Sequence, residues 1–225
     1  MNSENNTKQM LIEAAYNMIL EKGAENIRVR DLAKRVGCSA AALYKHFESL
    51  DYLLALASVR FLKPYIEELE ENLKNEDDII EAQINAWRLF DKYAFMHPYI
   101  FLNLFWGNIR NDLESILQEY LKMYPVFVEG SNTAMFYCSI FSGCIEDRDY
   151  IWFRRAAAEG RLSYDDAEYV SQINCLIARG LLSEYINSPK DPDAYQKAVA
   201  HCDALIEKTS ACISSEWSVS VPDRT

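Results

Sequence analysis

The feature that most constrains this chain is the helical spacing of its apolar residues, which nowhere gives way to the sustained alternation that strands require. After Thr7, apolar residues recur three and four positions apart, at Leu11, Ala14, Ala15, Met18 and Ile19. This spacing places them on one face of an α-helix. Gly23 follows where a helix commonly ends in a left-handed residue. The pattern predicts a first helix with Thr7 as its N-cap and an end near Gly23.

The same spacing continues along the chain, so we expect an all-α fold. Residues 50–73 follow a capping Ser49 and form a long apolar segment that contains Pro64. Because proline has no backbone donor, Pro64 should kink or end this helix.

Further helices are expected in the second half of the chain. Residues 113–124 carry a clean apolar stripe that Pro125 would end. Another helix is expected from Ser163 to residue 187. It has apolar residues on two sides, so it needs packing partners on both sides. Asp191-Pro192 has the order of a cap followed by an N1 proline and predicts a last helix that continues to residue 213.

These breaks divide the chain into an N-terminal domain at 1–49, a larger helical domain at 50–213 and a flexible tail at 214–225, with 50–73 as the connector. Charge follows the same division. Residues 1–60 hold eight Lys and Arg against seven Asp and Glu, a net charge of +1, within a chain whose net charge is −11. Because an acidic surface repels DNA, any contact with nucleic acid is expected in the N-terminal part.

Several classes of protein and site are not indicated. No apolar stretch approaches the roughly 18 residues that span a bilayer, and residues 1–8 lack the apolar core of a signal peptide. We therefore expect a cytoplasmic protein that has no membrane partner and whose six cysteines are free thiols. Phosphate-binding, nucleophile and metal-ligand motifs are absent from the sequence. No catalytic residue, metal ion or cofactor is predicted.

Residues 28–54 predict a helix-turn-helix. The apolar residues Leu32, Ala33 and Val36 mark a short helix that stops at Gly37, and Ser39 is placed to cap the next one. In that next helix Leu43 and Phe47 are expected to lie inward, with Ala40, Ala41, Tyr44 and Lys45 facing outward. Two short helices around a glycine turn also occur in helical proteins that do not bind DNA, so this geometry alone leaves both interpretations open.

The side chains of this segment favour one of them. Val29-Arg30-Asp31-Leu32-Ala33, Val36-Gly37-Cys38-Ser39 and Ala42-Leu43-Tyr44-Lys45-His46-Phe47, followed by Ser49 and Leu53-Leu54, resemble the N-terminal domain of TetR family transcriptional regulators. The resemblance covers about residues 7–55. It implies a homodimer that binds a double-stranded, palindromic DNA operator, and a helical effector-binding and dimerisation domain beyond residue 60. The chain departs from the family at Arg28, often a Thr or Ser cap, at Leu50, often Lys, and in its alanine-rich outward face.

The resemblance implies which residues touch DNA. The N-terminal part of the second helix would enter the major groove, where alanine methyl groups can contact thymine methyl groups and longer side chains reach phosphates or base edges. The residues expected to contact DNA are Arg28, Arg30, Ser39, Ala40, Ala41, Tyr44, Lys45 and His46.

Residues 84–153 hold seventeen of the 28 aromatic residues. Most are expected to be core, but helices with this many rings commonly leave a cavity, and the resemblance implies one for an effector. We expect a small apolar or aromatic effector. Acidic residues at 129, 146, 147 and 149 permit a cationic one, but a solvated acidic surface is the explanation that we favour for them. The candidate lining residues are Trp87, Phe90, Tyr93, Phe101, Phe105, Trp106, Phe127, Phe136, Phe141 and Trp152.

For the dimer, the helices at 163–187 and 192–213 carry more apolar surface than one core needs. The candidate interface residues are Val170, Ile177, Ala178, Leu181, Tyr185, Val199, Cys202 and Ile206.

Three functions remain open from the sequence. The first is a ligand-responsive transcriptional regulator, most simply a repressor whose effector changes the spacing of its two DNA-reading domains. The second is a helical small-molecule binding protein with weakened DNA specificity, as Leu50 and the alanine-rich face would suggest. The third is an enzyme on a helical scaffold that carries no recognised motif.

Overall fold

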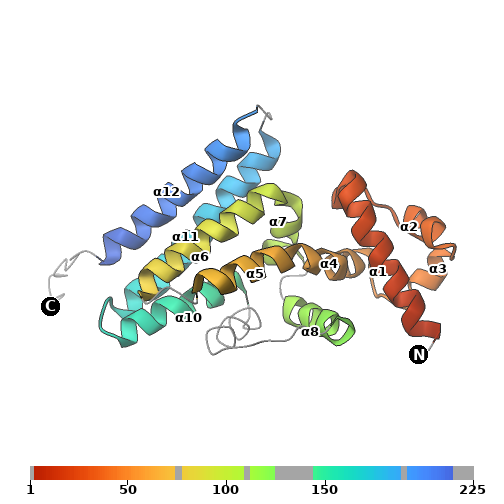
Figure 1. Cartoon of the computed structure of the whole chain (residues 1–225), viewed down its shortest axis with the longest axis horizontal. Helices are drawn as coiled ribbons and strands as arrows, with labels where there is room; N and C mark the ends of the chain where they lie inside the picture. The colour runs from red at the N-terminus through yellow and green to blue at the C-terminus, as the bar shows by residue number, and fades with distance from the viewer. Residues whose placement is uncertain (1–2, 74–77, 109–111, 125–143, 189–191, 215–225) are drawn as a thin grey trace, which may run out of the picture.

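The computed structural model describes residues 3–73, 78–108, 112–124, 144–188 and 192–214, and within these ranges every regular element is helical. A small head lies at one end of the molecule and a larger helical body makes up the rest (Figure 1). The elements of the head and the joint are α1 (Ser3–Lys22), η1 (Ala24–Asn26), α2 (Val29–Val36), α3 (Ala40–Leu43), α4 (Leu50–Ser58) and η2 (Val59–Phe61). The elements of the body are α5 (Leu62–Leu73), α6 (Ile79–Met96), α7 (Pro98–Trp106), α8 (Leu113–Met123), α10 (Ile145–Ala158), α11 (Tyr164–Asn187) and α12 (Ala194–Ser214).

Helix α1 begins earlier than predicted. It starts at Ser3, so Thr7 lies inside the helix and is not its N-cap. No proline or glycine separates Ser3 from Thr7, so nothing in the backbone prevents one more turn. Gly23 does adopt a positive φ of 81°, but its ψ of 150° lies outside the left-handed helical region. The chain therefore turns sharply out of α1 into η1.

The connector is two helices, in place of the single one predicted for 50–73. Ser49 caps α4, with its Oγ accepting from the amide of Tyr52 at 3.0 Å. The three residues of η2 then separate α4 from α5, and Pro64 lies in the first turn of α5. A proline ring conflicts with the carbonyl four residues earlier, here that of Arg60, which explains a break upstream of the proline.

The body is built around α6. Helix α6 packs against α5, α10 and α12, while α11 packs against α7, α10 and α12. Asp78 caps α6 by accepting from the amides of Ile80 and Glu81, at 2.8 and 3.1 Å. Within the described ranges, no helix is both long and apolar enough to cross a membrane.

Helix α12 begins later than predicted. Its first residue is Ala194, and Pro192 lies in the preceding turn and does not occupy the first helical position. The carbonyl of Asp193 accepts from the amide of Lys197 at 3.0 Å, which places the start of the helical hydrogen bonds at Asp193, one residue past the proline. The predicted flexible tail, except residue 214, lies outside the described residues.

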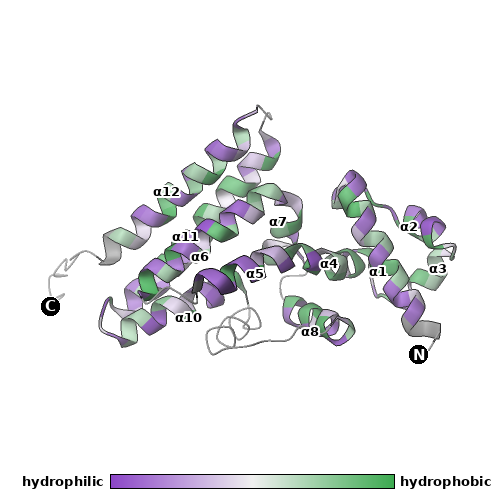
Figure 2. Cartoon of the chain, viewed as in Figure 1, coloured by the Kyte–Doolittle hydropathy of each residue, from purple (hydrophilic) through white to green (hydrophobic). Residues whose placement is uncertain are grey.

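Figure 2 shows that hydrophobic and hydrophilic residues are mixed along single helices, for example α1 in the head and α12 in the body. One continuous core cluster extends from the head to the body. It includes Leu11 and Leu43 of the head, Leu53 of α4, and Phe90 and Phe101 of the body. Helix α4 belongs to this cluster at both ends, since it packs against α1 on one side and against α7 and α8 on the other. The head and the body therefore share one core.

Candidate DNA-binding and ligand-binding sites

The turn between α2 and α3 has the geometry that its glycine permits. Gly37 adopts φ 76° and ψ 27°, the left-handed region. The amide of Cys38 donates to the carbonyl of Ala33 at 2.9 Å, and that of Gly37 to Lys34 at 3.3 Å. These two bonds form a Schellman motif, which ends α2 and redirects the chain toward α3.

Ser39 starts the second helix as predicted. Its Oγ accepts from the amide of Ala42 at 3.1 Å. The α-helical part of α3 ends at Leu43, and the next turn tightens because the amide of His46 bonds the carbonyl of Leu43 at 3.0 Å, three residues back. Leu43 and Phe47 are buried at 0% and 2% exposure. They anchor α3 on the core.

The outward face of α3 is uncovered. Tyr44 is 53% exposed, Ala41 and Lys45 are exposed, and Ala40 is half-buried. Ser39 is also exposed and His46 is half-buried. No other part of the described chain covers this face, so it is available to a macromolecular surface.

Ion pairs sort the basic residues of the head into two groups. Arg35 donates from two nitrogens to the carboxylate of Glu21, both at 2.5 Å, and Lys22 pairs with Asp31 at 3.1 Å. By contrast, Arg28, Arg30 and Lys45 are exposed and form no ion pair with any residue that the structure describes. Lys34, in the last turn of α2, is likewise exposed and has no ion-pair partner among the described residues. The free cations thus lie along α2 and just past the end of α3, and those at residues 28, 30 and 45 are where DNA contact was predicted.

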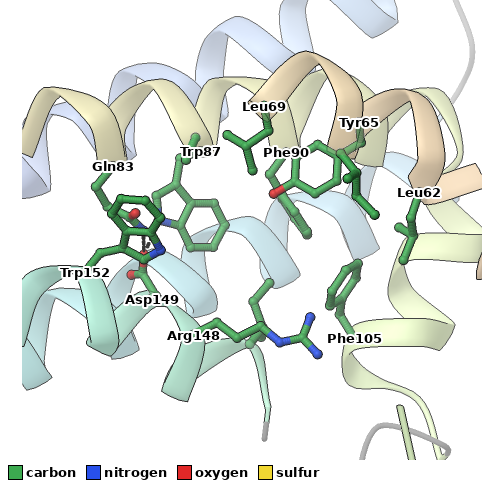
Figure 3. Close-up of a pocket in the computed structure, with 13 residues that line it drawn as sticks. Leu62, Tyr65, Leu69, Gln83, Trp87, Phe90, Phe105, Arg148, Asp149 and Trp152 are labelled. Carbon is green, nitrogen blue, oxygen red and sulfur yellow. Dashed lines mark hydrogen bonds between the residues drawn. The ribbon is translucent and has the colours of Figure 1, made fainter. Parts of the chain in front are cut away.

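A second site lies in the body, where α5, α6, α7 and α10 enclose a cavity (Figure 3). Its volume, counted over the positions available to the centre of a water-sized sphere, is about 70 Å³. Its walls are mostly apolar and aromatic, and its polar groups come from Tyr65 of α5 and from α6 and α10. The lining residues are Leu62, Tyr65, Ile66, Leu69, Gln83, Ala86, Trp87, Phe90, Phe105, Ile145, Arg148, Asp149 and Trp152.

Two charged residues of the cavity are buried on adjacent positions of α10. Asp149 is 3% exposed, and its Oδ1 accepts from the indole of Trp87 at 2.8 Å and from the amide of Gln83. Burial raises the pKa of Asp149 well above its usual value. Arg148 is 9% exposed, and its guanidinium lies 5.4 Å from the centre of the Phe105 ring. Burial lowers the pKa of Arg148 to about 10, so it remains cationic at neutral pH.

Comparison with known proteins matches the head to a family. The model described as bacterial regulatory proteins of the tetR family matches residues 11–56, which extend from α1 through the helix-turn-helix into α4. The chain belongs to the TetR family. It is therefore a DNA-binding transcriptional regulator, in a family that is not one of enzymes.

Two relatives from Bacillus subtilis (strain 168) are similar to this TetR-family chain. The uncharacterized HTH-type transcriptional regulator YwcC is 24% identical over 187 residues, 79% of this chain and 75% of YwcC. The HTH-type transcriptional regulator PksA is 33% identical over 106 residues, 39% of this chain and 51% of PksA. That second alignment spans about half the length of PksA.

The fold of the whole chain is similar to solved structures. The crystal structure of RolR in complex with resorcinol aligns over 95% of both chains with a TM-score of 0.56, at 13% sequence identity. This identity is low, so the likeness concerns the fold alone. It supports the all-α architecture of an N-terminal helix-turn-helix and a C-terminal helical domain.

The aromatic candidates of this TetR-family chain fall into three groups. Trp87, Phe90, Phe105 and Trp152 line the cavity. Phe101 and Trp106 pack in the core, with their rings 5.3 and 6.0 Å from that of Phe90, and Tyr93 donates to Glu68 at 2.7 Å on the outer side of α6. Phe127, Phe136 and Phe141 lie outside the described residues.

The polar residues of the cavity were not predicted as such. Gln83 and Arg148 were not considered, and Asp149 was grouped with acidic residues of a solvated surface, which is wrong because Asp149 is buried. The apolar residues that flank them, Trp152 and Phe153, were the available signal. They mark one side of α10 as buried, and that side includes residues 148 and 149.

The predicted dimer residues divide by burial. Val170, Ala178, Cys202 and Ile206 are between 0% and 2% exposed inside the single chain. They serve the chain's own core and offer no surface to a second copy. Ile177, Leu181, Tyr185 and Val199 are half-buried and pack against the same core. The exposed apolar residues of α11 and α12 are Tyr164, Tyr169, Leu176 and Leu205.

Proposed function

We propose that this TetR-family regulator is a repressor that binds a palindromic operator as a homodimer and is released when a small aromatic effector occupies the cavity between α5, α6, α7 and α10. The observation that carries this proposal is the position of α5. One helix lines the cavity with four residues and continues, through η2 and α4, to the helix-turn-helix. Effector binding would then move the DNA-reading head by a displacement of α5.

Contacts between the head and the body support such a route. Arg60 of η2 donates to Glu13 of α1 at 2.8 Å, and the hydroxyl of Tyr124 reaches the same carboxylate at 3.3 Å. Glu119 of α8 pairs with Lys8 of α1 and accepts from Tyr52 of α4. Because these contacts fix α1 against α4 and α8, a shift of α4 carries the whole head with it.

On the DNA side, α3 is proposed as the helix that enters the major groove. Exposed Tyr44 and Lys45 and half-buried His46, in the turn that follows α3, form one surface with it. The methyl groups of Ala40 and Ala41 are suited to thymine methyl groups. Arg28 and Arg30 at the start of α2 are proposed to contact the phosphate backbone, since they have no ion-pair partner among the described residues. Ser39 completes the set at the entry of α3.

A homodimer is proposed through the outer face of α11 and α12. Leu176 is 61% exposed, Tyr169 58% and Leu205 37%. Large apolar residues at such exposure on adjacent helices are typical of an interface between subunits. Gly180 of α11 has open space where a Cβ would be, which leaves room for close approach of a second helix. Two copies would present two heads to half-sites about 34 Å apart.

A gel shift with the DNA upstream of the protein's own gene tests the DNA-binding part. We expect a salt-sensitive complex with that DNA, and no comparable complex with a scrambled duplex of equal length. Addition of a small aromatic compound that raises the melting temperature of the protein should dissociate the complex. A protein that binds such compounds yet shows no preference for any duplex would instead be the helical small-molecule binding protein that the alanine-rich α3 favours.

The structure of RolR offers a precedent for the effector class. RolR was crystallised with resorcinol, a single-ring aromatic compound, and shares the fold of this chain. At 13% identity the likeness concerns the fold alone, so resorcinol serves only as an example of a single-ring ligand bound by this fold. The four aromatic residues that line the cavity here are consistent with a ring of that size.

A further inference from the structure

Arg148 is a buried cation whose hydrogen bonds are incomplete. Its Nε and Nη2 are inaccessible to solvent and have no hydrogen-bond partner in the described part of the chain. A guanidinium carries five donors and is always charged at neutral pH. Burial of an uncompensated charge is strongly unfavourable, so an anionic group bound in the cavity would satisfy donors that the described part of the chain leaves unpaired.

The carboxylate next in sequence does not neutralise this charge. Asp149 accepts from Gln83 and Trp87 on α6. Figure 3 shows its carboxylate turned toward those residues, while the Arg148 guanidinium extends toward Phe105. No salt bridge joins the two within the described chain. The cavity therefore has a cationic end beside Phe105 and a carboxyl end beside Trp87, with aromatic rings between them.

The carboxyl end also has a free position. Oδ2 of Asp149 is buried and has no hydrogen-bond partner among the described residues. A neutral hydroxyl or amide of a ligand would satisfy this oxygen. A second carboxylate would be disfavoured there, because burial of a charge without a cationic partner is unfavourable.

The volume limits the size of the ligand. A cavity of about 70 Å³ on this measure holds roughly five water molecules. That space suits a single aromatic ring with small substituents. The rings of Phe90 and Trp87, whose centres are 5.3 Å apart, form its aromatic wall.

On the basis of the proposed function, we propose that the effector is a small aromatic monocarboxylate, with its carboxylate on Arg148 and a neutral polar substituent facing Asp149. A guanidinium binds a carboxylate with two parallel hydrogen bonds, which matches the two free nitrogens. The aromatic rings of the cavity wall, which pack edge to face on one another, would contact the planar body of the ligand.

Isothermal titration calorimetry on the full-length protein tests this class with 4-hydroxybenzoate as the probe. Its neutral amide, 4-hydroxybenzamide, has nearly the same shape and lacks the charge. We expect the acid to bind at least about tenfold more tightly than the amide. Terephthalate, with a second carboxylate, and benzamidine, a cation, should both bind more weakly than 4-hydroxybenzoate.

Two substitutions of Arg148, with a control elsewhere on α10, test whether this residue causes the preference for the acid over the amide. Arg148→Gln should bring acid and amide to similar affinities and raise the melting temperature of the ligand-free protein, because a buried unpaired charge is removed. Arg148→Lys should recover part of the preference for the acid. Arg154→Gln, an exposed arginine on the same helix, should change neither the preference nor the melting temperature.

Three results would overturn the proposal: no preference for the acid in the wild-type protein, an unchanged preference in Arg148→Gln, or no binding of 4-hydroxybenzoate at millimolar concentration. The gel shift of the wild-type protein is a separate readout. If the operator is bound but the acid is not preferred, the ligand class is wrong and the regulator stands. If the acid binds through Arg148 but no DNA is recognised, the proposed function fails.

Discussion

The guanidinium of Arg60 lies 4.2 Å from the centre of the Tyr16 ring and donates to Glu13 of the same helix at 2.8 Å. Arg60 belongs to η2, the turn that joins α4 to the cavity helix α5, and Tyr16 belongs to α1 of the head. One side chain thus links the segment that an effector would move to the longest helix of the DNA-binding head.

Arg60→Ala should uncouple these two parts. The pair is about half exposed, so we expect the free energy of unfolding to fall by only about 1 kcal/mol. Operator affinity without effector should change little, but a larger effector concentration should be needed for release, measured as a gel shift titrated with the compound. Lys63→Ala breaks an exposed pair with Glu67 on neighbouring α5 and should leave the titration unchanged; equal effects of both variants would contradict a role for Arg60.

Gly37→Ala should destabilise the turn of the helix-turn-helix. The backbone there has φ 76°, which an L-residue adopts at a cost of roughly 1–2 kcal/mol, so the melting temperature should fall by roughly 2–8 °C. Gly160→Ala is the matched control, with φ 77° at the end of α10 and equally open space around its Cβ position. Both variants should lose stability, but only Gly37→Ala should also lose operator affinity below the melting temperature.

Charge reversal at Lys45 or Arg30 should weaken binding to every DNA sequence. Each lost phosphate contact should reduce the slope of log affinity against log salt concentration by about one. Fluorescence anisotropy with a labelled duplex at several salt concentrations measures both quantities. Arg154→Glu makes the same change of charge on α10 of the body and should preserve the slope. Wild-type affinity in both Lys45→Glu and Arg30→Glu would refute the proposed contacts.

Asp91→Asn should stabilise the protein, and the gain should grow with pH. Asp91 of α6 is 0% exposed and lies near Asp203 of α12; burial raises its pKa well above the usual value. Above about pH 4 the unfolded chain releases this proton while the folded chain retains it, so the acid disfavours folding increasingly as the pH rises toward the pKa of the folded state. Asparagine cannot ionise, so Asp91→Asn removes this pH-dependent loss of stability.

Thermal melts between pH 4 and neutral pH measure that difference. The gain of Asp91→Asn over the wild type should be small near pH 4 and larger at neutral pH. Glu184→Gln, at an exposed position of α11, should show no such trend. A gain that does not depend on pH would mean that Asp91 is ionised in the folded protein.

Leu176→Glu should dissociate the proposed dimer. The side chain is 61% exposed on α11, so a charge there does not disturb the fold of one subunit but would be buried in an α11–α12 interface. Light scattering should report a monomer, and operator affinity should fall because one head alone reads half a site. Met96→Glu, which changes an apolar residue that is 49% exposed at the end of α6, should remain dimeric; a dimer in both variants would place the interface elsewhere.

Predictions succeeded where the structure depends on residues close together in the chain. The caps at Ser39 and Ser49, the end of α2 at Gly37 and the inward Leu43 and Phe47 were all predicted, because each follows from hydrogen bonds or spacing within a few residues. The start of α12 was predicted too early, because that prediction rested only on the local signal of Pro192. Such a local rule predicts where a helix begins to within one or two residues, and the surrounding packing decides which residue is the first.

The sequence by itself therefore determined the helical class and the helix-turn-helix, since a serine cap, a glycine with positive φ and a repeat of three and four residues act within one or two turns. The tertiary structure decided which charged residues enter the cavity. Arg148 and Asp149 stand in a run of four charged residues that includes the exposed Asp147. The rotation of α10 against α5 and α6, driven by burial of its apolar side, places two of them inside and leaves the others toward solvent. The local pattern of apolar residues indicates only which side of α10 is buried. What that side meets is decided by contacts such as those of Asp149 with Gln83 and Trp87, more than sixty residues away in the chain.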